Sequence, residues 1–94
     1  MFQHVLLFKF RDPEVCAAEV GRRLLTLPAL IPEIADMTYH TDELHGPRSY
    51  DACLIVTFRD RAGYEVYDRD PHHNEVRKYI HAHVTESHTA DYSC

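Results

Sequence analysis

Near its N-terminus the sequence reads FQHVLLFKF at residues 2–10. One set of alternating positions holds Phe2, His4, Leu6, Phe8 and Phe10, and the other set holds Val5 and Leu7. An extended chain with this pattern has two apolar faces, which is typical of a central β-strand buried on both sides. We therefore expect residues 2–10 to form an inner strand of a sheet.

Local signals on the rest of the chain place the other elements. Asp12-Pro13 begins a predicted helix at residues 13–27, and Asp70-Pro71 begins another that ends near residue 83, because Asp is a good N-cap and Pro suits the first helical position. Asp60 can cap a further short helix that precedes the one beginning at Asp70-Pro71. Three further strands are predicted at residues 34–41, 51–58 and 85–92. This β-α-β-β-α-β order predicts an α+β, ferredoxin-like protomer with one domain over residues 1–94.

Two helices can cover only one face of a four-stranded sheet. By alternation we expect the other face to carry Val5, Leu7, Met37, Tyr39, Cys53 and Ile55. An exposed apolar patch of that size is unusual on a monomer. We therefore predict a homodimer with twofold symmetry, in which two sheets pack face to face.

Composition and charge exclude several classes of protein. The 94 residues include 10 Lys+Arg against 15 Asp+Glu, a net charge of −5 with no basic stripe, so we expect neither nucleic acid nor an anionic membrane as a partner. The sequence has no apolar run of about 18 residues and no signal-peptide pattern. An odd number of cysteines, three, without a Cys-x-x-Cys pair indicates reduced thiols and a cytoplasmic location.

Cofactor signals are equally sparse. The three glycines stand apart, so the sequence has no Gly-rich loop for a phosphate. Among the eight histidines, no pair has the i, i+4 helical spacing of a metal site, and His73 and His81 share a helix face with Arg77, whose charge would repel a cation. We expect no metal and no cofactor.

Three polar residues could perform acid/base chemistry. If Asp70 caps its helix, His73 lies in the first turn, where the helix dipole keeps the imidazole neutral and able to act as a base. Tyr67, six residues earlier, could donate to a carbonyl oxygen, and His4 faces the same layer as Leu6 and Phe8. The same residues could equally form a satisfied structural hydrogen bond in the core.

Two motifs resemble a known family. The H-V-x-x-F-K-F start at His4 and the Y-x-x-x-P-x-H junction at Tyr67 are similar to those of the stress-responsive dimeric α/β-barrel (Dabb) domains. The resemblance covers nearly the whole chain and implies a ferredoxin-like protomer whose two sheets close a dimeric α/β barrel. Most members have no known function, but one plant polyketide cyclase closes a linear poly-β-keto chain by intramolecular aldol condensation.

The resemblance also implies roles for individual residues. The acid/base pair of that cyclase falls on Tyr67 and His73, a pocket histidine on His4, and a late aspartate on Asp91. A histidine on its third strand falls on Ala52, which departs from the cyclase pattern. Because of that departure, the identity of the substrate stays open.

Together these observations predict a cofactor-independent acid/base enzyme that acts on a small oxo compound, as a polyketide cyclase does. His73 and Tyr67 are the expected catalytic residues. The expected substrate-binding residues are His4, Leu6, Phe8, Leu24, Leu54 and Asp91. Two alternatives remain: a non-catalytic, stress-responsive dimer that binds a small molecule, and a cofactor-free monooxygenase. In each case the expected partners are a small molecule and a second copy of the chain.

Overall fold

Four antiparallel strands form one sheet in the order β2-β3-β1-β4, in a computed structural model that describes residues 1–94. The strands are β1 (Phe2–Phe10), β2 (Ile34–Thr41), β3 (Ala52–Phe58) and β4 (Val84–Ser93). The helices are α1 (Pro13–Leu24), α2 (Arg61–Arg69) and α3 (Pro71–His83), and a 3₁₀ turn, η1, spans Leu27–Ala29. The ferredoxin-like α+β fold predicted from the sequence is confirmed, with β1 in the interior of the sheet.

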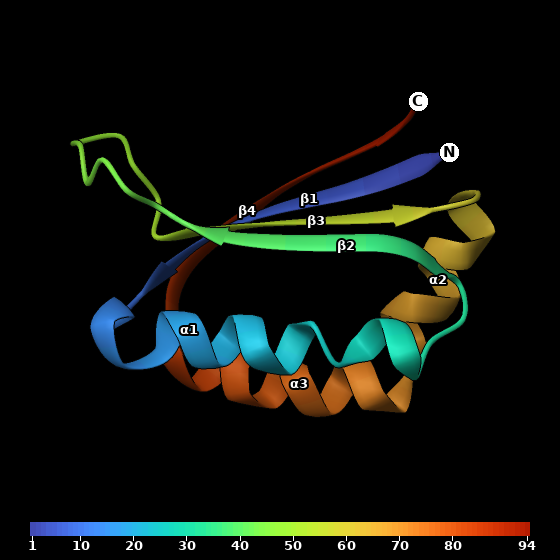
Figure 1. Cartoon of the computed structure of the whole chain (residues 1–94), viewed down its shortest axis with the longest axis horizontal. Coiled ribbons are helices and arrows are strands. Elements are labelled where there is room, and N and C mark those ends of the chain that lie inside the picture. The colour runs from blue at the N-terminus through green and yellow to red at the C-terminus, as the bar shows by residue number, and fades with distance from the viewer.

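All three helices lie on one side of the sheet (Figure 1). α1 and α3 run side by side beneath it, and α2 lies at the end where β3 and α2 are joined. The opposite face of the sheet is bare. None of the helices has the length and apolar character that crossing a bilayer requires.

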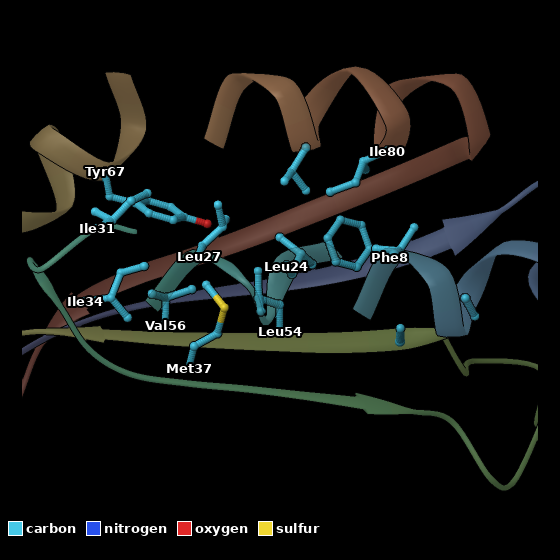
Figure 2. Packing of buried hydrophobic residues seen from close by; sticks show 14 of the residues in the cluster. Phe8, Leu24, Leu27, Ile31, Ile34, Met37, Leu54, Val56, Tyr67 and Ile80 are labelled. Carbon is cyan, nitrogen blue, oxygen red and sulfur yellow. The ribbon is translucent and has the colours of Figure 1, made fainter. Parts of the chain in front are cut away.

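The core fills the layer between the sheet and the helices, as Figure 2 shows. Phe8, Leu54 and Val56 point into it from the sheet and meet Leu24 and Leu27, all of them almost completely buried. The prediction that β1 is buried on both sides is wrong for the single chain. Leu7, on the bare face, is 36% exposed, because no helix covers that side of the sheet.

A β-bulge changes which residues of β2 face the helices. The pairing of β2 with β3 shifts by one residue between Ile34 and Asp36, which reverses the alternation expected for the rest of β2. Met37 is buried in the core, and the Tyr39 hydroxyl donates to the carbonyl oxygen of Ala17 on α1. The prediction that Met37 and Tyr39 lie on the bare face is therefore wrong.

The first helix begins at Pro13 after Asp12, as predicted, but it ends earlier than predicted. The Asp12 side chain makes no capping hydrogen bond, and its backbone carbonyl oxygen accepts from the Cys16 N–H instead. The helix ends at Leu24 rather than at residue 27, and the separate turn η1 contains Pro28, which has no N–H to continue an α-helix. At α2 and α3 the predicted caps are confirmed, since the carboxylates of Asp60 and Asp70 accept backbone N–H groups.

Gly21 allows β2 and α1 to approach closely, and we expect Gly21→Ala to lower the free energy of unfolding by about 1–3 kcal/mol. A Cβ atom at this position would lie 2.5 Å from Cε1 of Tyr39, whose ring is held by its hydrogen bond to Ala17. Urea denaturation would measure the effect. Gly63→Ala is the matched control, because the nearest atom to its new Cβ would be 3.5 Å away. A gain in stability from Gly21→Ala would contradict this account.

Candidate functional site

A cavity of about 260 Å³ opens between the sheet and the helices α1, α2 and α3. Seven of the eight predicted site residues line it: His4, Leu6, Phe8, Leu24, Leu54, Tyr67 and His73. Asp91 is not part of the wall, but it is hydrogen-bonded to His4, which is. A larger, more open hollow of about 490 Å³ lies by the loop between β2 and β3 and contains none of the predicted residues.

The junction of α2 and α3 positions Tyr67 and His73. Asp70 ends α2 and caps α3, so Pro71 is the first residue of α3 and His73 the third, as predicted. The Nδ1 atom of His73 lies 2.9 Å from the backbone carbonyl oxygen of Tyr67, and the two rings stack with centroids 3.9 Å apart and planes inclined at 23°. The short connection between two helices therefore holds the two side chains face to face.

The environment of His73 determines its protonation state. A carbonyl oxygen can only accept, so His73 carries its proton on Nδ1, and Nε2 is left with a lone pair. Burial, and after it the nearby Arg77 guanidinium, lower the pKa of His73 to about 4. The ring is therefore neutral at pH 7, as predicted, and burial is the largest cause.

The Tyr67 hydroxyl is the one buried side-chain polar atom without a hydrogen-bond partner. Tyr67 projects from α2 into the layer between the helices and the sheet, with its oxygen among apolar side chains (Figure 2). Burial raises the pKa of Tyr67 well above its usual value, so the group stays a phenol and can donate. Leaving such a group unpaired costs about 1–3 kcal/mol, which a ligand oxygen could recover.

His4 and Asp91 form a second polar pair across the sheet. They face each other on the neighbouring strands β1 and β4, and the His4 Nδ1–H donates to Oδ1 of Asp91. The His4 ring lies 5.1 Å from the ring of Tyr64 and 6.4 Å from that of Tyr67, centroid to centroid. The carboxylate fixes the tautomer of His4 and leaves its Nε2 free to interact with a ligand.

The cavity also contains residues that the sequence did not single out for the site. Tyr64 lies one turn before Tyr67 on α2, and its ring packs near those of Phe2, Phe58 and His4. Arg77 and His81 follow His73 at successive four-residue steps on α3, so all three line the same cavity. That spacing is visible in the sequence, but only the packing of α3 shows that this helix face borders the site.

The lowered pKa of His73 predicts that the protein loses stability in mild acid. The unfolded chain takes up a proton near the ordinary pKa of 6.5, whereas the folded chain resists it until about 4, so this part of the stability is complete above about pH 6.5 and declines as the pH falls toward 4. Between about pH 7.5 and about pH 5 we expect a loss of about 1–2 kcal/mol from this residue.

Urea denaturation at both pH values, at one protein concentration, would measure this loss. His73→Gln is the control, because its amide stays neutral throughout and its stability should decline less than that of the unmodified protein. Equal declines in the two proteins would mean that the burial of His73 does not disfavour its protonation.

One four-stranded antiparallel sheet with helices on a single face defines a ferredoxin-like α+β domain, here with two tyrosines and three histidines in the wall of its cavity. Residues 2–94 match the family model of the stress responsive A/B barrel domain, Dabb, and the chain belongs to this family. No curated protein matches the sequence.

Solved structures support the same fold. A dimeric ferredoxin-like protein of unknown function from Bacteroides fragilis is 21% identical, with a TM-score of 0.90 over 99% of this chain and 95% of that chain. A protein of Arabidopsis thaliana is 22% identical, with a TM-score of 0.86 over 100% of this chain and 95% of that one. A hydroxynitrile lyase from Passiflora edulis is 16% identical, with a TM-score of 0.79 over 97% and 90% of the two chains.

Proposed function

We propose that this protein is a cofactor-independent acid/base enzyme that acts on a small oxo compound, and specifically a polyketide cyclase that performs an intramolecular aldol reaction. The observation that carries the proposal is the stacked Tyr67–His73 pair, which combines an unpartnered buried phenol with a neutral imidazole. A phenol that can donate beside an imidazole that can accept is the combination that enolate chemistry requires.

In the proposed reaction, Nε2 of His73 removes a proton from a carbon that lies between two carbonyl groups. The electron pair moves onto a carbonyl oxygen, which accepts a hydrogen bond from the Tyr67 hydroxyl as negative charge develops. The enolate carbon then attacks a distant carbonyl of the same chain and forms the new C–C bond. The resulting alkoxide takes the proton back from the His73 imidazolium, so the enzyme is unchanged at the end.

Burial of His73 makes it a weak base, and the acidity of the substrate must compensate for that. A proton flanked by two carbonyls is already acidic, and the enolate that forms stands beside the new imidazolium in a surrounding of low dielectric constant. The charges appear together as a close pair, which costs less than a lone imidazolium in the same place. This preference favours poly-β-keto compounds over simple ketones.

The remaining site residues would orient the substrate. His4, held by Asp91, can bind a second carbonyl oxygen, while Leu6, Phe8, Leu24 and Leu54 provide an apolar wall that fits a carbon chain. Holding the chain in one folded conformation selects one ring closure among the spontaneous alternatives. That a hydroxynitrile lyase has this fold supports an enzymatic role.

We also propose that the working form is a homodimer in the cytoplasm. The bare face of the sheet carries Val5, Leu7 and Ile55, and a second sheet packed against it would bury them. Structures of similar fold from Bacteroides fragilis and Thermobifida fusca are described as dimeric. The cytoplasmic location is supported by the three cysteines, none of which forms a disulfide.

A product profile tests the proposed activity. A polyketide synthase that releases reactive linear poly-β-keto intermediates would be incubated with and without this protein, and the products separated by liquid chromatography and identified by mass spectrometry. A cyclised product that appears only with the protein would support a cyclase. An unchanged profile would refute it, and saturable binding of the intermediates without turnover would favour the non-catalytic alternative.

A further inference from the structure

We propose that Arg77 selects substrates that carry a carboxylate, by binding that group at the wall of the Tyr67–His73 cavity. The inference rests on the proposed function, because it assumes that this cavity holds the substrate. It goes beyond that function in naming a required chemical group and the residue that recognises it. Neither the family motifs nor the catalytic pair involves Arg77.

The cavity wall carries one positively charged residue and no acidic residue. Arg77 is the only residue of the wall with a permanent charge, and no aspartate or glutamate lines the cavity. The other titratable groups of the wall are tyrosines and histidines: His4, Tyr64, Tyr67, His73 and His81. None of these carries a negative charge near neutral pH unless its pKa is strongly lowered. The nearest carboxylates, those of Asp68 and Asp91, contact Arg77 and His4 without lining the cavity, so Arg77 is the group of the wall that can pair with an anion.

The hydrogen bonds of Arg77 leave donors free for a ligand. Its Nη1 donates to the backbone carbonyl oxygen of Asp68 at 2.7 Å and to Oδ1 of Asn74 at 3.1 Å, and its Nη2 donates to Oδ1 of Asp68. A guanidinium has five N–H donors, so two remain after these three bonds. The Arg77 side chain is 34% exposed, which leaves it open to a ligand that enters the cavity.

Asp68 both positions Arg77 and competes for it. Together with the backbone of α2 it anchors the guanidinium one turn after His73 on α3, so the positive charge stays near the reacting groups. Yet the Asp68 carboxylate is itself 44% exposed and is not part of the cavity wall. A substrate carboxylate inside the cavity would share the guanidinium with it, through bonds that are stronger than those between neutral groups.

A bound carboxylate would also affect the catalytic base. Arg77 lowers the pKa of His73, because two positive charges so close together repel each other. A carboxylate on Arg77 would offset that repulsion and make the imidazole more basic only when an acidic substrate is present. Recognition of the acid and activation of His73 would then be coupled through one residue.

The test compares a stable acid with its neutral isostere. Salicylate and salicylamide have nearly the same shape and differ in charge, and an NMR titration measures the dissociation constant of each even when binding is weak. We expect the unmodified protein to prefer salicylate by about tenfold or more. Arg77→Gln should abolish this preference, whereas Asp68→Asn should increase it, because it removes the competing carboxylate.

Lys78→Gln is the matched control. It removes the same charge from the next residue of α3, but Lys78 is exposed, pairs with Glu75 and lies outside the cavity. The preference for salicylate should survive this change. If Arg77→Gln does not fold, as judged by circular dichroism, Arg77→Lys keeps the charge without the planar fork and should retain only part of the preference.

The outcomes separate this inference from the proposed function. Equal affinity for the two probes in the unmodified protein, or an unchanged preference in Arg77→Gln, would overturn the role of Arg77 while leaving a cyclase possible. A preference that depends on Arg77 would support the inference even if no cyclised product forms. Failure of both probes to bind would overturn the inference together with the assignment of this cavity as the substrate site.

Discussion

We expect His73→Ala to lose about 10²–10⁴-fold of the proposed cyclase turnover, which is the contribution of a general base. The variant removes the only neutral imidazole that stacks on Tyr67 and can take the proton from the carbon between two carbonyls. Tyr67→Phe should lose about 10²–10³-fold, because it removes the donor to the developing enolate and keeps the ring. Rates of product formation at saturating substrate would measure both effects.

His72→Ala is the control for this experiment. It removes a histidine from the same turn of α3, but His72 is exposed and its ring contacts Asp70 rather than the cavity. Full activity in His72→Ala together with a large loss in His73→Ala would locate the base. Unchanged turnover in both His73→Ala and Tyr67→Phe would refute the roles proposed for the pair.

The pH dependence adds a second readout. Because burial lowers the pKa of His73 to about 4, the imidazole of the free enzyme remains unprotonated from pH 8 down to about pH 5. The value of kcat/KM should therefore stay flat over this range and fall only in stronger acid. A decline centred near pH 6.5 would instead indicate a base with the pKa of a solvent-exposed histidine.

We expect Ile55→Glu to convert the proposed homodimer into a monomer and to weaken association by about 10³-fold or more. Ile55 lies in the middle of the bare sheet face, paired with Val5 on β1 and with Thr38 on β2. In a twofold dimer built on this face, each interface would receive two unpaired carboxylates, and each of them costs several kcal/mol to bury. Sedimentation velocity at micromolar concentration would measure the change.

Val15→Glu provides the comparison for Ile55→Glu. It introduces the same charge at an apolar residue, but Val15 is 67% exposed on α1, on the other side of the sheet from the bare face (Figure 1). It should leave the dimer intact. A protein that is already monomeric before substitution, or one that remains dimeric as Ile55→Glu, would show that the two chains do not associate through this face.

Much of the fold could be predicted from the sequence, because the signals that determine it involve residues close together along the chain. Asp60 and Asp70 begin their helices with the side-chain hydrogen bonds that their positions predict, and the alternation of β1 and β3 correctly identifies the residues that face the core. The Tyr67–His73 pair was also predictable, because six residues across a helix junction leave little freedom in how the two side chains approach each other.

Predictions failed where a distant contact outweighs the local pattern. Alternation along β2 places Met37 on the bare face, but the bulge against β3 turns it into the core. A bulge depends on how two strands pair, so neither strand reveals it alone. Arg77 was considered in the sequence only as a charge that would repel a metal, although it shares a helix face with His73. Its contacts with Asp68 and its place in the cavity wall depend on how α3 packs against α2.

The sequence by itself determined the order of the elements, the ends of α2 and α3, and the chemistry available at Tyr67 and His73, because these depend on residues close together along the chain. Tertiary structure alone decided that His4 meets Asp91, that the Tyr67 hydroxyl has no partner, and that Arg77 is the only permanent charge on the cavity wall. Each of these features depends on elements that are far apart in the sequence and come together only in the folded chain. Their pairing and burial follow from how the sheet and helices pack, which sets the solvation and the charge that each group experiences.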